Sequence, residues 1–210
     1  MQKTYYYKNF DFSIDLALHY YKEFKNSKII LDVGCGTGEF GKIKPNNKIE
    51  VYGIDCDYTA LNAASKYEIV KMVDLDCENL PFEDNFFDAI LAKDILEHLQ
   101  KPWLLLKEIH RIMKDDGIII ASVPMPKSDI VWSDYTHLRG FTKECIETLF
   151  RDSQYDVIYV KKMGDIPFFR RFGLSEYIPN FLEIPPMNYF FGITFEIKAK
   201  KLSNINGDAI

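Results

Sequence analysis

The stretch of sequence that decides the fold is Leu31-Asp32-Val33-Gly34-Cys35-Gly36-Thr37-Gly38-Glu39. An apolar run over 28–33, which we predict to be a buried strand, leads directly into three glycines at alternate positions. Residues without a side chain let the backbone turn tightly and approach a ligand closely. Because the loop runs toward a helix start, it suits a polar or anionic ligand group. The stretch predicts a ligand-binding turn between a strand and a helix.

The spacing of the glycines separates this loop from one that binds a dinucleotide. A dinucleotide loop has the pattern G-x-G-x-x-G, and its third glycine would stand at Glu39. Here Gly38 comes one residue earlier, and a carboxylate at Glu39 is unfavourable beside a docked pyrophosphate. The loop therefore argues against a nicotinamide oxidoreductase. A turn without any ligand is the alternative interpretation of the glycines alone.

A carboxylate follows the next predicted strand. Asp55 comes directly after the apolar run 49–54, about 20 residues past the glycine loop. At the tip of a neighbouring strand, such a carboxylate can accept hydrogen bonds from both ribose hydroxyls of a nucleoside. A solvated aspartate at a strand end is the alternative. Together, the loop and the acid favour binding of a nucleoside cofactor.

The remaining chain alternates short apolar runs with helical patterns, which favours stacked βα units. We predict a Rossmann-like α/β fold whose seven-stranded sheet is mostly parallel, with helices on both faces and an antiparallel last strand. The predicted helices cover 12–25, the segment that begins at Pro102 and stops at 115–117, and the segment from the cap Thr142 to Phe150. The predicted strands are 28–33, 49–54, 69–73, 87–92, 118–123, 155–161 and 190–199.

Length and composition fit one domain, which we place at 1–202, with a polar, disordered tail over 203–210. The chain has 210 residues, 47% of them hydrophobic, and a net charge of -5. A basic domain or stripe, the mark of a nucleic-acid binder, is not seen. No apolar run approaches the roughly 18 residues of a membrane span, and the first residues do not resemble a signal peptide. We therefore expect a cytoplasmic protein that does not bind nucleic acid.

Several motifs, taken in order, resemble those of class I S-adenosylmethionine-dependent methyltransferases, in particular those of type 11. The segment 31–38 resembles the first motif of that family, and Asp55 resembles its ribose-binding acid. The resemblance covers roughly residues 28–150, and it implies methyl transfer from S-adenosylmethionine. The helix after the glycine loop is shorter than the family pattern because Pro45 interrupts it. The later segments that continue the resemblance are 76–82, 87–90, 96–99 and 108–117.

The resemblance also implies a set of cofactor-binding residues. Asp76 would accept a hydrogen bond from the adenine amino group, and the backbone N–H of Cys77 would meet the ring. Three cysteines follow the first three strands, and we interpret them as small residues that line the nucleoside pocket instead of ligands of a metal. We predict no metal site. The implied set is Asp32, Gly34, Cys35, Gly36, Gly38, Asp55, Cys56, Asp76, Cys77, Lys93 and His98.

Two histidines are candidates for acid–base chemistry at the edge of the sheet where open α/β folds bind ligands. His98 follows the fourth strand, and the resemblance places it on the cofactor side. His137 stands in a loop, 132–142, that is similar to one in methyltransferases of surface-glycan and lipid-linked sugar pathways, although Gly140 replaces an expected proline. We predict that His137 is a general base on an acceptor hydroxyl and that Arg139 holds a phosphate or carboxylate. A loop that caps its own backbone is the alternative.

The segment 165–187 mixes aromatic residues with two arginines, Arg170 and Arg171. We interpret it as a lid or cover of the sheet edge. A peripheral membrane contact or a dimer surface are alternatives, so the protein is expected to be a monomer or a homodimer.

The predicted acceptor is a small-molecule or lipid-linked sugar. The alternatives are another small metabolite, such as a quinone or an amine, and a cofactor-binding module without turnover. The run 92–95 after the fourth strand lacks the motif of nucleic-acid methyltransferases.

Overall fold

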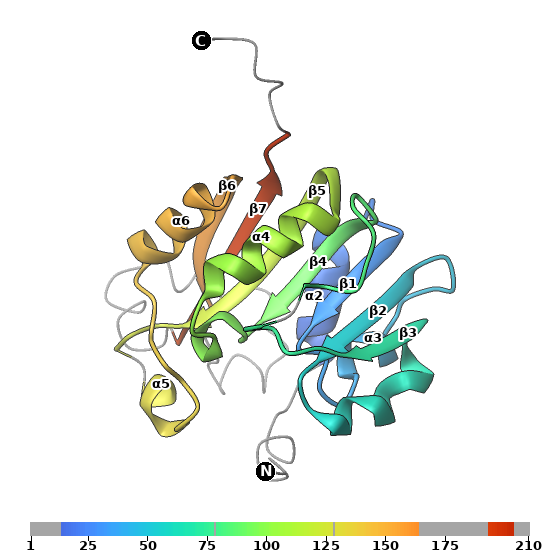
Figure 1. The fold of residues 1–210 in the computed structure, drawn as a ribbon, viewed down its shortest axis with the longest axis horizontal. Coiled ribbons are helices and arrows are strands. Elements are labelled where there is room, and N and C mark those ends of the chain that lie inside the picture. Colours follow the sequence, from blue (N-terminus) through green and yellow to red (C-terminus); the bar gives the residue numbers. More distant parts are fainter. Residues whose placement is uncertain (1–13, 78, 128, 164–192, 204–210) are drawn as a thin grey trace.

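The computed structural model describes residues 14–77, 79–127, 129–163 and 193–203, which form a seven-stranded sheet in the order β3-β2-β1-β4-β5-β7-β6 (Figure 1). Neighbouring strands from β3 to β5 pair in parallel, whereas β7 pairs antiparallel with both β5 and β6. This topology confirms the predicted Rossmann-like sheet. The strands are β1 (Ile29–Val33), β2 (Glu50–Asp55), β3 (Ile69–Met72), β4 (Phe87–Lys93), β5 (Met113–Pro124), β6 (Tyr155–Met163) and β7 (Thr194–Lys201).

Both faces of the central strands are buried because helices cover each of them. On β1, Leu31 belongs to one hydrophobic cluster and the adjacent Ile30 to the other, as the twofold alternation of a strand requires. Helices α4 (Pro102–Ile112) and α6 (Lys143–Asp152) lie over one face, and α2 (Ile14–Glu23) lies over the opposite face (Figure 1). Apolar residues at successive strand positions therefore serve two cores.

The strand β5 begins earlier than the sequence predicted. We expected a turn over 115–117 before a strand at 118–123, but the described strand starts at Met113. Its pairing with β4 is irregular: Phe87 faces Met113, and two residues later Ala89 faces Ile118. The predicted turn therefore persists as a bulge inside the strand, where Asp116 has a φ of 66°.

Four short elements connect the strands at the edge where the parallel strands end. They are α3 (Glu39–Lys42), the 3-10 helices η1 (Tyr58–Lys66) and η2 (Leu96–His98), and α5 (Asp129–Ser133). The four-residue length of α3 agrees with the predicted shortening of that helix. Both η1 and α5 lie at the lower edge of the sheet in Figure 1. The sequence did not predict η1 or α5, because neither carries a long amphipathic repeat.

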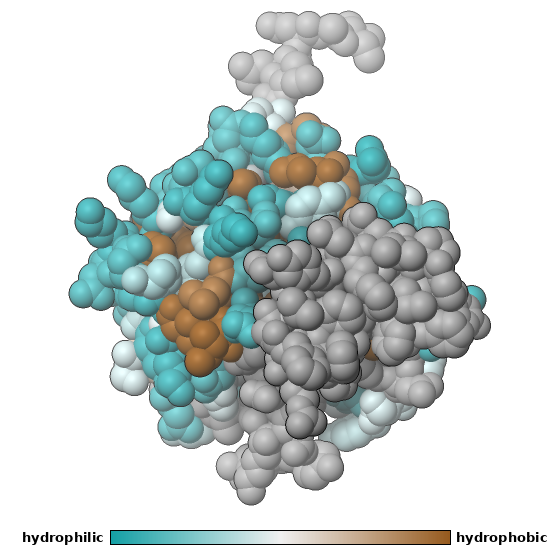
Figure 2. Space-filling model, turned by 180° about the vertical axis from the view of Figure 1, so that it is seen from behind, coloured by the Kyte–Doolittle hydropathy of each residue, from teal (hydrophilic) through white to brown (hydrophobic). Residues whose placement is uncertain are grey.

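The view from behind shows a described surface that is mostly hydrophilic, with hydrophobic residues gathered in a few separate patches (Figure 2). Among the described residues, no helix combines the length and the apolar character needed to cross a membrane. The predicted lid or membrane contact at 165–187 and the predicted tail beyond residue 203 lie outside the described residues.

Candidate functional site

The glycine loop requires glycines because its backbone is left-handed at all three positions. The φ angles are 77° at Gly34, 48° at Gly36 and 81° at Gly38. A Cβ at Gly34 would stand 2.0 Å from Cδ1 of Ile95, which leaves no room for a side chain. The loop lies on the end of β2, where the N–H groups of Gly34 and Cys35 donate to the carbonyl of Ile54 at 2.8 and 3.0 Å. The expected turn is therefore present.

The predicted ribose-binding acid lies against this loop. Asp55 is buried, and its Oδ2 accepts a hydrogen bond of 2.8 Å from the N–H of Gly36. Its Oδ1 accepts one of 2.8 Å from the N–H of Asp57. The fold thus brings the carboxylate and the glycine loop together, although they are about 20 residues apart in the sequence.

A second carboxylate, Asp32, lies beneath the loop and is 6% exposed. The hydroxyl of Tyr67 donates to its Oδ2 at 2.7 Å and accepts from the N–H of Gly41 at 3.2 Å. Burial raises the pKa of Asp32 to about 7, against the hydrogen bond from Tyr67 that lowers it. Tyr67 was not predicted as a site residue, because no motif connects it to an aspartate 35 positions earlier.

The predicted adenine-side residues lie in the segment before β4. Oδ1 of Asp76 accepts hydrogen bonds from the N–H groups of Gln100, at 2.8 Å, and Lys101, at 3.3 Å, just before α4. Asp76 therefore joins this segment to the helix start. Cys77 and Cys56 are exposed, whereas Cys35 is buried against Gly53. Within the described part of the chain, no cysteine belongs to a group with metal-binding geometry.

The end of β4 carries a pair of opposite charges. Lys93 forms an ion pair with Asp94, and both side chains are largely buried. Asp94 has a φ of 53°, and its Oδ1 accepts a hydrogen bond of 2.8 Å from the hydroxyl of Ser122 on β5. These contacts fix the turn that leads from β4 into η2.

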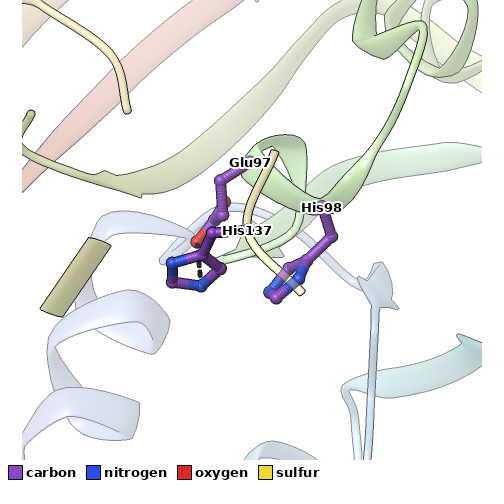
Figure 3. A group of neighbouring side chains, drawn as sticks. All are labelled: Glu97, His98 and His137. Atoms are coloured by element: carbon purple, nitrogen blue, oxygen red, sulfur yellow. Dashed lines mark ion pairs between the residues drawn. The ribbon is translucent and has the colours of Figure 1, made fainter. Parts of the chain in front are cut away.

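The two predicted histidines come together: His98 is the last residue of η2, and His137 lies in the loop after α5 (Figure 3). The ring centroids of His98 and His137 are 4.6 Å apart, with an interplanar angle of 64°. Nδ1 of His137 is 2.8 Å from the carbonyl of Val131, and Nδ1 of His98 is 3.0 Å from the hydroxyl of Thr136. Both rings are therefore held in place through Nδ1.

Glu97 completes this group and is not among the site residues predicted from the sequence. Its side chain points toward His137 (Figure 3), and the distance from Oε1 to Nε2 of His137 is 4.0 Å. The residue is fully buried, and neither carboxyl oxygen has a hydrogen-bond partner among the described residues. Burial, reinforced by the charge of Asp94, raises the pKa of Glu97 well above its usual value.

The predicted anion clamp, Arg139, lies in the same loop as His137. Its Nη2 donates to the carbonyl of Gln100 at 3.1 Å. Its Nε is buried and has no hydrogen-bond partner in the described structure. The guanidinium therefore keeps a donor that an incoming oxygen could satisfy.

Comparisons with known proteins agree with this fold. Residues 31–121 match the family model of a methyltransferase domain. An uncharacterised protein of Methanocaldococcus jannaschii is 36% identical over 124 residues, which are 59% of this chain and 47% of that protein. A Bos taurus protein named "Probable tRNA methyltransferase 9B" is 32% identical over 106 residues, which are 49% of this chain and 22% of that protein.

Solved structures show the same architecture. A SAM-dependent methyltransferase from Archaeoglobus fulgidus superposes with a TM-score of 0.68 at 21% identity, covering 90% of this chain and 95% of that one. This likeness concerns the fold. The chain spans about half or less of the length of the two curated relatives, so their acceptors belong to those proteins alone.

Proposed function

We propose that this chain transfers a methyl group to a hydroxyl of a small-molecule acceptor. The chain belongs to the class I S-adenosylmethionine-dependent methyltransferase family. The cofactor of this family is S-adenosylmethionine. In our proposal the acceptor is a sugar or a lipid-linked glycan precursor, as the resemblance of the loop 132–142 suggests. Methyl transfer from a sulfonium depends mainly on alignment and, for a hydroxyl, on removal of a proton.

The observation that carries the proposal is the contact between His137 and His98, whose ring centroids are 4.6 Å apart. The first histidine comes from the acceptor-side loop and the second from the segment that the family resemblance assigns to the cofactor side. The carbonyl of Val131 can only accept a hydrogen bond, so Nδ1 of His137 carries the proton. Its Nε2 is then the basic nitrogen, and we propose that it removes the hydroxyl proton.

Arg139 supports an acceptor that carries an anionic group. Its buried Nε lacks a partner in the described structure, and a buried donor left unsatisfied is unfavourable by about 1–3 kcal/mol. A phosphate or carboxylate oxygen would satisfy it. We therefore propose a phosphorylated or acidic acceptor, such as an activated sugar. Another small metabolite is the alternative if sugars are not methylated.

The first experiment is a calorimetric titration with S-adenosylmethionine, S-adenosylhomocysteine and NAD, on the wild type and on Asp55→Ala. We expect micromolar binding of the first two ligands to the wild type only, because Asp55 is the predicted ribose ligand. Asp57→Ala is the matched control, since its carboxylate is not assigned to the cofactor. Binding of NAD alone, or of no ligand, would reject the assigned cofactor site.

A second experiment tests the acceptor side. Candidate sugars, nucleotide sugars and lipid-linked sugars are screened for methyl transfer from labelled S-adenosylmethionine. With the best acceptor, we expect His137→Ala to lower kcat by about 10²–10⁴-fold, the usual contribution of a general base. Unchanged turnover in His137→Ala would remove that histidine from the mechanism. Transfer to RNA but to no small molecule would reject the proposed acceptor class.

A further inference from the structure

We propose that Glu97, His98 and His137 bind a divalent transition-metal ion, with zinc as the best fit to the donor set. One carboxylate oxygen and one ring nitrogen from each histidine all lie within 4.8 Å of one another. Two imidazoles and a carboxylate suit zinc and related ions better than magnesium or calcium, which prefer oxygen ligands alone. This proposal departs from our sequence-based expectation of no metal.

The buried carboxyl group of Glu97 is the main reason for the proposal. It is fully buried, and both of its oxygens lack a hydrogen-bond partner among the described residues. A buried polar group without a partner is unfavourable, and such groups are rare in folded proteins. Its side chain points at His137 (Figure 3). An ion between the two would satisfy the carboxylate.

The hydrogen bonds set His137 in the tautomer that binds metals through Nε2. Its Nδ1 donates to the backbone carbonyl of Val131 at 2.8 Å, since a carbonyl cannot donate. Nε2 then carries the lone pair and lies 4.0 Å from Oε1 of Glu97. A ligand histidine held by a carbonyl at its other nitrogen is the usual outer arrangement of metal sites.

A chain of two hydrogen bonds likewise sets the tautomer of His98. The hydroxyl of Thr136 donates its single proton to Oδ1 of Asp134 at 2.6 Å. It must therefore accept from Nδ1 of His98, at 3.0 Å, which places the ring proton on Nδ1. The carboxylate–threonine–histidine chain orients the ring and, in the neutral form of His98, places the lone pair on Nε2.

The distances suit an ion after a small contraction. Ligand atoms about 2.1 Å from a tetrahedral zinc ion are about 3.4 Å apart. The Glu97–His137 distance of 4.0 Å requires each of these two side chains to move by about 0.3 Å, and ligand atoms up to 4.8 Å apart require a correspondingly larger movement. Asp134 lies nearby, with its Oδ2 3.9 Å from Nε2 of His137, and can serve as a fourth ligand. With three ligands, one position stays open, as in catalytic zinc sites.

The role of the ion rests on the proposed methyl transfer to a hydroxyl and would replace the base role proposed for His137, whereas the binding of the ion depends on neither. An acceptor hydroxyl bound at the open position would lose its proton more readily. His137 would then act as a ligand, and its Nε2 would not be available as a free base. Because activity alone cannot separate these two roles, the test measures binding directly.

The experiment titrates Co²⁺, a spectroscopic substitute for zinc, into the full chain without cofactor or acceptor. We expect visible d–d bands that saturate at one ion per chain and that zinc abolishes. Glu97→Gln and His137→Gln should weaken binding more than ten-fold, because each removes a ligand. Thr136→Val, which keeps the shape but removes the hydroxyl, should weaken binding about 10–100-fold through His98.

His110→Gln is the matched control, since His110 lies on α4 and contacts the carbonyl of Leu202. It should bind Co²⁺ as the wild type does. Near-ultraviolet thiolate bands would assign the ion to the cysteines, and unaltered binding in Glu97→Gln and His137→Gln would likewise reject the site. Thermal unfolding of each variant without metal checks folding. Loss of cofactor binding in the separate calorimetric titration would reject the proposed function but not the metal site.

Discussion

At the scale of single residues, Asp32 is in an unfavourable position for an ionised group. It is buried below the glycine loop, next to the carboxylate of Asp55, and one hydrogen bond from Tyr67 compensates only in part. The pKa of about 7 means that this carboxyl is protonated in the folded protein at mildly acidic pH. Its ionisation opposes folding, in contrast to that of a surface aspartate.

This raised pKa predicts a pH dependence of stability. Unfolded Asp32 titrates near pH 4, so between about pH 4 and 7 the folded state binds the extra proton and stability falls as pH rises. The Asp32→Asn variant has no ionisable group at this position, so its free energy of unfolding should not show this decrease. The decrease in the wild type amounts to at most about 4 kcal/mol. Urea unfolding at several pH values measures it. Asp156→Asn, at an exposed position, should keep the wild-type dependence of the free energy of unfolding on pH. The same dependence in Asp32→Asn would contradict the prediction.

At the scale of elements, local signals set where helices begin. Thr142 precedes α6, and its side chain accepts a hydrogen bond of 3.2 Å from the N–H of Cys145, as the sequence predicted. The apolar side of α6 packs Ile146 and Phe150 against the sheet. Because the cap and the apolar spacing are both local in sequence, this helix was predicted closely.

Removal of the cap should weaken the helix start. We expect Thr142→Ala to lower the free energy of unfolding by about 1 kcal/mol, because the N–H of Cys145 then loses its partner. Thr148→Ala, at an exposed position inside the same helix, should change it by less than about 0.5 kcal/mol. Chemical denaturation of both variants provides the comparison. Equal effects would show that the cap does not stabilise α6.

At the scale of the whole molecule, a buried acid joins distant parts of the chain. Glu196 on β7 is fully buried and pairs with His19 of α2 at 3.0 Å and with Lys161 of β6 at 3.0 Å. The hydroxyl of Tyr159 donates to the same carboxylate at 2.9 Å. Burial alone would raise the pKa of Glu196, but His19 and Lys161 hold it below its usual value. This network connects α2 to β6 and β7.

Replacing Glu196 with a neutral residue should lower the stability of the whole domain. We expect Glu196→Gln to lower the free energy of unfolding by about 1–3 kcal/mol at neutral pH. The lowered pKa means that the wild type loses this advantage as pH falls through the folded value, so the difference should shrink in acid. Glu68→Gln, which breaks the more exposed pair with Lys44, should change stability by less than about 1 kcal/mol. A similar effect of both variants would contradict the network.

The sequence by itself determined the seven strands of the sheet, their order along the chain and the glycine loop with Asp55. These features depend on local information: apolar runs, alternate glycines whose left-handed backbone excludes side chains, and an acid at a strand end. It also identified His98 and His137 as residues of interest. The assignments of the individual cofactor and acceptor residues stay predictions.

Only the tertiary structure decided how those residues meet. The contact of Tyr67 with Asp32 joins positions 35 residues apart, and the support of His98 by Thr136 joins positions 38 residues apart. The carboxyl group of Glu97 is buried without a hydrogen-bond partner among the described residues. Solvent exclusion and hydrogen-bond geometry arise when chain segments pack together, and neither is encoded in a short motif. The metal site proposed at Glu97 could therefore be inferred only after the strands and loops had been placed in space.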